Sequence, residues 1–170
     1  MYLSNESFDF TKQLEDEIIR VEILDTDKYG RSLGYIFYKV KLWNEELLKN
    51  GLAHFYSYSD DKYTNRLKKA EASAMKNEIG LWKKSSSYGC VSIVELKYTE
   101  DGKRCTNKER LTLQNFCEPM EIYLKDDATH DELIDIPHGR YEMNFSCIFN
   151  DDGDSLFIWK NDGLLAFERY

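Results

Sequence analysis

The periodicity of the sequence changes near residues 84–88, and this change most restricts the folds open to the chain. Before it, one stretch alternates apolar and polar residues, and later stretches repeat apolar residues at helical spacing. After it, short apolar stretches follow one another, separated by turn signals such as Asp101-Gly102 and Asn161-Asp162-Gly163. We therefore expect two domains: residues 1–84 with strands and helices, and residues 88–170 as an antiparallel β-sandwich.

The two parts also differ in charge. Residues 1–84 hold 14 basic and 14 acidic residues, whereas the remainder holds 9 basic and 17 acidic residues and so carries the whole net charge of −8. Such a difference is typical of two separate modules. The negative net charge argues against a protein that coats nucleic acid non-specifically.

The pattern in residues 1–84 predicts a β-hairpin and three helices. Val21 and Ile23 point to one side of the first strand, and Gly30 lies in the polar turn, where it is free to adopt a positive φ. The expected elements are a helix over 4–16 with Ser4 as N-cap, strands over 18–24 and 32–38, a short helix from N-cap Asn44 to Gly51, and a helix over 64–79 that buries Leu67, Ala70 and Ala74.

The second part contains six expected strands and all of the cysteines. None of the cysteines forms a CxxC pair, which makes a zinc ribbon unlikely to form, and we expect reduced thiols buried in a small sandwich. The strands are expected at 91–98, 110–116, 120–124, 141–149, 155–160 and 164–170, and the cysteines are Cys90, Cys105, Cys117 and Cys147.

The first ten residues have neither the basic region nor the apolar region of a signal peptide. The sequence contains no run of about 18 apolar residues, so we expect no membrane-spanning helix. The localisation of the protein stays open.

Residues 26–36, Thr-Asp-Lys-Tyr-Gly-Arg-Ser-Leu-Gly-Tyr-Ile, closely resemble the hairpin of the staphylococcal nuclease (thermonuclease) family. Further matches follow in the family's order: Asn44-Glu45 with Leu47, Gly51-Leu52-Ala53, Tyr56 with Tyr58, Leu67 to Ala74, and Gly80-Leu81-Trp82. Six matches in order over half the chain are far more specific than any one of them.

The resemblance implies a five-stranded OB-type barrel with three helices, and calcium-dependent cleavage of phosphodiesters in DNA and RNA. In this chemistry a metal ion and arginines stabilise the charge that develops on the phosphate oxygens. DNA or RNA is therefore an expected partner, and calcium is the cofactor of the family. Members of the family are often exported.

The resemblance also assigns roles to five residues. Arg31 matches a catalytic arginine, whose guanidinium can bind two phosphate oxygens and stays charged at any working pH. Lys28 and Tyr29 match residues that hold a terminal phosphate of a bound nucleotide. Tyr56 and Tyr58 match the aromatic pair beside the base, where stacking contributes about 1–3 kcal/mol per base.

Each of these residues also has a purely structural interpretation. Arg31 can be a hairpin arginine paired with Asp25 or Asp27, which fit turn positions and do not match the family's metal ligands. Tyr56 and Tyr58 can pack under the third helix. The surrounding motif favours a phosphate site for Arg31, whereas the two interpretations of the tyrosines are balanced.

The resemblance is incomplete at its N-terminal side. In the family, three barrel strands precede the helix that corresponds to residues 4–16, and these strands carry the calcium ligands, another arginine and the glutamate that orients water. Met1 stands just before that helix. We therefore expect a truncated barrel, no metal site in this chain, and hydrolysis that is impaired or that needs a complementing segment.

An incomplete barrel would expose an unpaired strand edge and the apolar side of Ile19, Val21 and Ile23. A second chain, a second copy of this chain or the sandwich domain could cover this face, or it could stay uncovered. The alternative function is a non-catalytic module that binds nucleic acid or a protein.

Residues 88–170 resemble lamin-tail domains. The matching stretches are Asn107 to Asn115, Glu118 to Ile122, Asn150 to Phe157 and Asp162 to Leu165. Together, the two resemblances imply a mainly β fold with α: a partial OB-fold barrel with three helices, lacking its first three strands, followed by an immunoglobulin-like antiparallel β-sandwich.

Overall fold

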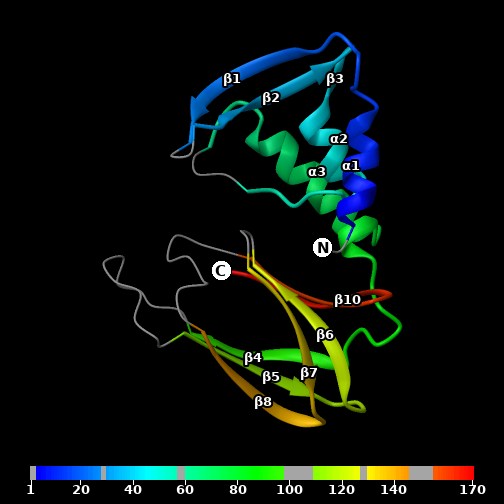
Figure 1. Ribbon diagram of the computed structural model, residues 1–170, viewed down its shortest axis with the longest axis vertical. Coiled ribbons are helices and arrows are strands. Elements are labelled where there is room, and N and C mark those ends of the chain that lie inside the picture. The colour runs from blue at the N-terminus through cyan, green and yellow to red at the C-terminus, as the bar shows by residue number, and fades with distance from the viewer. Residues whose placement is uncertain (1–2, 28–29, 57–59, 98–108, 127–129, 146–154) are drawn as a thin grey trace. The chain divides into compact units, whose positions relative to one another are not determined.

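The computed structural model describes residues 3–27, 30–56, 60–97, 109–126, 130–145 and 155–170 (Figure 1). The chain divides into two compact units, Met1–Lys83 (the first unit) and Lys84–Tyr170 (the second unit). No helix within the described ranges is long and apolar enough to cross a membrane.

The first unit consists of a small antiparallel sheet and helices that pack on it. The sheet has the order β1-β2-β3, and Figure 1 shows α2 and α3 against one of its faces. The elements are α1 (Ser4–Lys12), β1 (Arg20–Thr26), β2 (Ser32–Tyr38), β3 (Lys41–Leu42), α2 (Trp43–Lys49), α3 (Thr64–Lys76) and a 3-10 turn, η1 (Gly80–Trp82).

The core of this unit lies between strands β2 and β3 and helices α2 and α3. Phe37 and Leu42 from the sheet pack with Leu48 from α2 and Leu67 and Ala70 from α3. The helical spacing of the last two residues places both on the inner face of α3. The predicted buried face of this helix, which also includes Ala74, is therefore confirmed.

The predicted caps of two helices are wrong. Leu3, not Ser4, is the N-cap of α1, and it makes no side-chain capping bond. Helix α2 begins at Trp43, so Asn44 already lies inside it. The Asn44 Oδ1 atom accepts a hydrogen bond from the backbone N–H of Ile36 at 2.9 Å, and its amide continues the pairing of β2 where β3 ends. Tertiary pairing thus outweighs the local preference for capping.

Two glycines hold the end of α2 against the end of α3. Gly51 has φ +60° and Gly80 has φ +59°, and the backbone N–H of Leu81 donates to the Gly51 carbonyl at 2.8 Å. A Cβ atom on Gly51 would lie 2.1 Å from the carbonyl oxygen of Ile79. Only glycine fits there, because both the conformation and the space exclude a side chain.

The second unit is a β-sandwich of two antiparallel sheets, with the strand orders β10-β9-β6-β7 and β4-β5-β8. Leu111 and Leu113 from one sheet and Ile122, Leu124 and Ile158 from the other are fully buried between them. The strands are β4 (Val91–Lys97), β5 (Glu109–Asn115), β6 (Met120–Lys125), β7 (Asp131–Ile136), β8 (Gly139–Phe145), β9 (Ser155–Lys160) and β10 (Gly163–Arg169).

One of these strands, β7, was not expected from the sequence. Its sequence, DELIDI, carries three acidic residues, and most of its side chains are exposed. The strand pairs with β6 at the end of its sheet, where Ile136 is the buried member. An edge strand needs little apolar pattern, because neither its outer edge nor its outer face is covered.

The expectation of reduced thiols is wrong for two of the cysteines. Cys90 and Cys117 form a disulfide, with an S–S distance of 2.04 Å. Val91 pairs with Asn115 in the β4–β5 ladder, so the flanking cysteines come within a Cα–Cα distance of 5.4 Å, which suits a disulfide. Disulfides of this kind are typical of oxidising compartments. Cys105 and Cys147 lie outside the described residues.

We predict that Gly51→Ala destabilises the first unit by several kcal/mol, because the new Cβ atom meets backbone atoms and the positive φ costs about 1–2 kcal/mol by itself. Urea unfolding followed by tryptophan fluorescence measures this. Gly30→Ala is the matched control, since Gly30 also has a positive φ, +81°, but open space around its Cβ position. Equal effects of the two substitutions would contradict the argument from close contact.

Candidate functional site

A hollow of about 640 Å³ lies in the first unit between the β1–β2 hairpin, α2 and the segment that leads to α3. It is named the hairpin hollow below. Asp25 and Leu33 line it from the hairpin, where they pair with each other across the two strands. His54 and Tyr56 line it from the segment before α3. The hollow combines apolar walls with a few polar groups, as ligand pockets do.

One polar pair fixes the inner wall of this hollow. The Tyr35 hydroxyl donates to Asp61 Oδ2 at 2.5 Å, and Asp61 Oδ1 accepts the backbone N–H groups of Tyr63 and Thr64 at 2.8 and 3.0 Å. The Tyr35 hydroxyl thereby holds the pKa of Asp61 below its usual range. Burial, together with Asp61, raises the pKa of Tyr35 well above its usual value. The pair ties β2 to the start of α3.

A buried glutamate positions the loop that carries Tyr56. Glu71 on α3 is only 3% exposed, and its Oε1 atom accepts the backbone N–H of Phe55 at 2.7 Å. A buried carboxylate with a backbone donor holds the main chain in one place. Tyr56 follows directly, lines the hairpin hollow and stays 45% exposed. The sequence analysis gave Glu71 and the Tyr35–Asp61 pair no role, because partners 16 and 26 residues apart have no local signal.

Arg31 lies at the closed end of the hairpin, two residues before Leu33. Its Nε atom donates to Asp27 Oδ2 at 2.5 Å, and its backbone N–H donates to Asp27 Oδ1 at 2.8 Å. The side chain of Arg31 is nevertheless 75% exposed. Of the two pairings open from the sequence, the structure contains the one with Asp27. The guanidinium is held by Asp27 at the end of the hairpin and remains accessible to solvent.

The remaining predicted site residues are placed only in part. Tyr56 lies in the hairpin hollow, whereas Lys28, Tyr29 and Tyr58 lie outside the described residues.

The described residues do not form a calcium site. Asp25 Oδ1 accepts the backbone N–H of Thr26 at 2.7 Å, and Asp27 is engaged with Arg31, so both carboxylates are used within the hairpin. In the part of the chain that the structure describes, no group of three or more His, Cys, Asp or Glu side chains could hold a metal ion. The carboxylate oxygens that calcium requires are not gathered at this hollow.

The outer face of the hairpin is apolar and exposed. Val21 is 50% exposed and Ile23 63%, although each would be expected in a core. Val21 pairs with Ile36 across the hairpin, and β1 has no second neighbour among the strands of the described residues. The structure therefore presents an open strand edge beside an exposed apolar face.

Comparison with known proteins decides the family. The family model of staphylococcal nuclease homologues matches residues 3–84, which include the hairpin, α2, α3 and the hairpin hollow. The first unit is a member of the staphylococcal nuclease family. The protein is thus a nuclease-family protein whose second unit, a β-sandwich, follows the nuclease unit.

Individual relatives agree with this assignment. The thermonuclease of Staphylococcus hyicus is 36% identical over 81 residues, which are 45% of this chain and 48% of that protein. The thermonuclease of Staphylococcus intermedius is 34% identical over 79 residues, 44% of this chain and 47% of that protein. The SPbeta prophage-derived endonuclease YokF of Bacillus subtilis is 36% identical over 91 residues, 51% of this chain and 31% of that protein. The chain spans about half the length, or less, of these relatives.

We predict that Tyr35→Phe lowers the free energy of unfolding by about 1 kcal/mol at neutral pH, the usual net value of one hydrogen bond. The effect should depend on pH because the pair depresses the folded-state pKa of Asp61. A depressed carboxyl pKa stabilises the folded state above the unfolded-state value of about 3.9, and this stabilisation is lost as the pH falls through the folded-state pKa.

Urea unfolding of the wild type and of Tyr35→Phe at a series of pH values measures this difference. We expect it to be full at pH 7 and to shrink in acid below about pH 4. Tyr38→Phe is a control on the same strand, since no bond between Tyr38 and Asp61 exists. A difference that stays constant down to pH 2 would show that Asp61 is not the partner that matters.

Proposed function

We propose that the nuclease unit binds nucleic acid at the hairpin hollow, with Arg31 on a phosphate and Tyr56 and Tyr58 beside a base. In this proposal the ancestral reaction is calcium-dependent hydrolysis of DNA or RNA phosphodiesters, and in this chain it needs a complementing polypeptide segment. The observation that carries the proposal is the exposed guanidinium of Arg31 on the hairpin whose Asp25 and Leu33 line a hollow together with Tyr56.

The chemistry of Arg31 suits a phosphate ligand. Its guanidinium presents several N–H donors in one plane and matches two phosphate oxygens at once. The Asp27 carboxylate holds one edge of the guanidinium, through Nε, and so orients the group before any ligand arrives. A phosphate gains from such a preorganised cation, because the binding event orders fewer side-chain torsions.

Tyr56 suits the sugar-base part of a nucleotide. The ring is partly exposed at the hairpin hollow, and Leu33 lies on the opposite, hairpin side. An aromatic face accepts any base by stacking, so this contact would give affinity without sequence preference. The relatives are thermonucleases and an endonuclease, and nucleic acid is the corresponding substrate class for this chain.

The complementing segment is proposed from the exposed face of the hairpin. Val21, Ile23 and the free edge of β1 offer an apolar surface and unpaired backbone groups to an added strand. We propose that a polypeptide equivalent to the unmatched half of the thermonuclease relatives covers this face. Since the described residues form no calcium site, that segment would also supply the metal ligands.

A non-catalytic binding module is the second candidate function. The ion pair between Arg31 and Asp27 favours this second function. The Asp27 carboxylate neutralises part of the guanidinium charge that would otherwise act on the phosphate. In that case the hairpin hollow would bind a strand of nucleic acid and leave it intact.

We predict that the chain hydrolyses DNA in calcium only after addition of the unmatched half of the Staphylococcus hyicus thermonuclease as a separate polypeptide. Arg31→Gln should then lower the rate by about 10²–10³, as is typical when one group that stabilises charge in the transition state is removed. Cleavage of a supercoiled plasmid, with and without the added segment, measures both effects.

Arg140→Gln is the matched control for this experiment, because Arg140 is also exposed and also pairs with a nearby carboxylate, that of Glu142. It should leave the rate unchanged. Cleavage by the chain alone that survives Arg31→Gln would overturn the proposed role of Arg31. Binding of DNA with no cleavage in either arm would support the binding module instead.

We also predict that Tyr56→Ala weakens binding of a short single-stranded DNA oligonucleotide by about tenfold, which corresponds to the lower part of the 1–3 kcal/mol range for one stacked base. Fluorescence anisotropy of a labelled oligonucleotide measures the affinity. Tyr56→Phe keeps the ring and should bind nearly as well as the wild type. An equal loss in both variants would mean that the hydroxyl, not stacking, makes the contact.

A further inference from the structure

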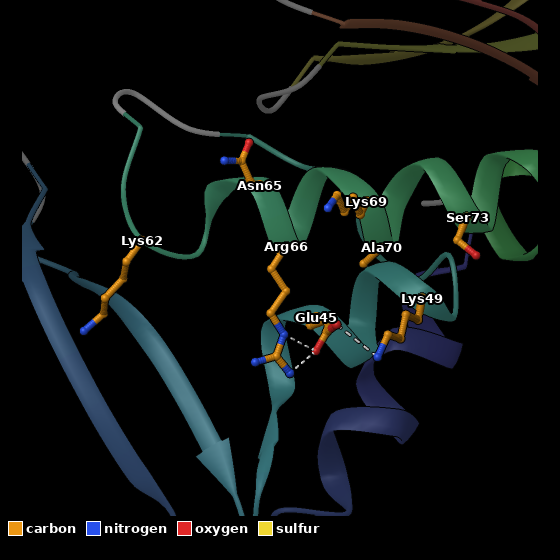
Figure 2. Close-up of a pocket in the computed structure, with 8 residues that line it drawn as sticks. All are labelled: Glu45, Lys49, Lys62, Asn65, Arg66, Lys69, Ala70 and Ser73. Atoms are coloured by element: carbon orange, nitrogen blue, oxygen red, sulfur yellow. Dashed lines mark hydrogen bonds and ion pairs between the residues drawn. The ribbon is translucent and has the colours of Figure 1, made fainter.

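A second hollow, of about 660 Å³, lies between α2 and α3 and is lined mostly by long polar side chains (Figure 2). It is named the basic hollow below. It shares no lining residue with the hairpin hollow. Four cations and one carboxylate line it: Lys49, Lys62, Arg66 and Lys69, with Glu45. The lining therefore carries more positive than negative charge, although Glu46 and Glu22, which lie outside it, pair with Lys49 and Lys62.

Glu45 organises the floor of the basic hollow. Arg66 donates to Glu45 Oε2 from Nε at 2.8 Å and also from Nη2, and Lys49 Nζ lies 3.0 Å from Glu45 Oε1. Figure 2 shows Arg66 and Lys49 pointing toward Glu45 from α3 and α2. The Arg66 guanidinium holds the pKa of Glu45 below its usual range. Two of the five N–H donors of Arg66 are used in this way, and the group is held in a fixed orientation.

Lys69 and Asn65 also line the basic hollow and offer further donors. Both side chains are exposed on α3, and neither has a hydrogen bond or an ion pair within the described ranges. They provide the three N–H donors of an ammonium group and the two of an amide. Lys62 differs from them, since its Nζ atom lies 2.5 Å from Glu22 Oε1 on β1. The donors available to a ligand are therefore those of Lys69, Asn65 and the outer edge of Arg66.

The spacing of the cations along the chain costs stability. Arg66 and Lys69 lie three residues apart on α3, whereas Lys62 precedes the helix. Like charges at such spacings on a helix destabilise it by about 0.2–0.5 kcal/mol per pair. A bound anion would remove this repulsion.

We propose that the basic hollow binds the sugar-phosphate backbone of a nucleic acid strand that the nuclease unit holds. This deepens the function proposed above and rests on it. Among the described residues that line the hollow, Ala70 is the one apolar residue and none is aromatic. A protein partner would lack the apolar or aromatic anchors that dominate protein interfaces, and a base would find no stacking surface. Cations with neutral donors are what phosphate contacts use.

The test measures binding of two single-stranded DNA ligands over a series of salt concentrations. One is an ordinary oligonucleotide, and the other has abasic sites throughout, so that it keeps the phosphates and lacks the bases. Lys69→Gln should weaken the binding of both ligands. Each phosphate contact on a single strand contributes about −0.7 to the slope of log K against log salt concentration, so the slope should become shallower by about 0.7.

Lys76→Gln is the matched control, because Lys76 is also exposed on α3, loses the same charge and does not line the basic hollow. It should leave the affinity and the slope at the wild-type values. Lys69→Glu should weaken binding further than Lys69→Gln. Circular dichroism shows whether each variant is folded, and both positions are exposed, so we expect no change.

The outcomes separate this proposal from the proposed function. Loss of abasic-strand binding in Lys69→Gln, without any cleavage by the complemented wild type, would support the basic hollow and count against the nuclease reaction. Cleavage by the complemented wild type, together with unchanged abasic-strand binding in Lys69→Gln, would support the nuclease reaction and count against the basic hollow as a binding site. The proposal for the basic hollow is also overturned if the wild type binds neither strand at low salt. It is overturned as well if polyglutamate competes as strongly as the abasic strand does, because that result indicates an acidic protein as the ligand.

Discussion

The packing of Phe37 and Leu42 against Leu48 and Leu67 is the contact on which the nuclease unit depends. It holds the hairpin to α2 and α3 from one side only. The same contact places the hairpin hollow, because the walls of that hollow are the hairpin, α2 and the approach to α3. The two glycines at the ends of α2 and α3 then fix how these helices meet. The position of the candidate site thus follows from the packing of this small core.

The packing from one side also explains the exposed apolar face of the hairpin. Side chains alternate along a strand, so a hairpin whose inner face packs on helices must turn the intervening residues outward. Val21 and Ile23 are these residues, and they are apolar although exposed. In contrast, the second unit buries both of its inner sheet faces in one core. The molecule therefore combines a sandwich whose two sheets share one core with a nuclease unit that has an uncovered sheet face and edge.

Much of the architecture was predictable because its signals are local. Alternation identified the hairpin and most of the sandwich strands, and helical spacing identified the buried face of α3. The errors arose where a distant partner decided the outcome. Asn44 bonds to β2 instead of capping α2, β7 is an edge strand without an apolar pattern, and the β4–β5 register brings Cys90 to Cys117.

The sequence by itself determined the family, the order of most of the elements and the candidate residues Arg31 and Tyr56, because motifs and periodicity depend on neighbours along the chain. Only the tertiary structure decided that Arg31 pairs with Asp27, that Tyr35 and Glu71 hold the walls of the hairpin hollow, and that α2 and α3 form a basic hollow around Glu45. Hollows and buried polar pairs join residues far apart in the chain. Their free energy depends on distance and burial in space, which no local pattern encodes.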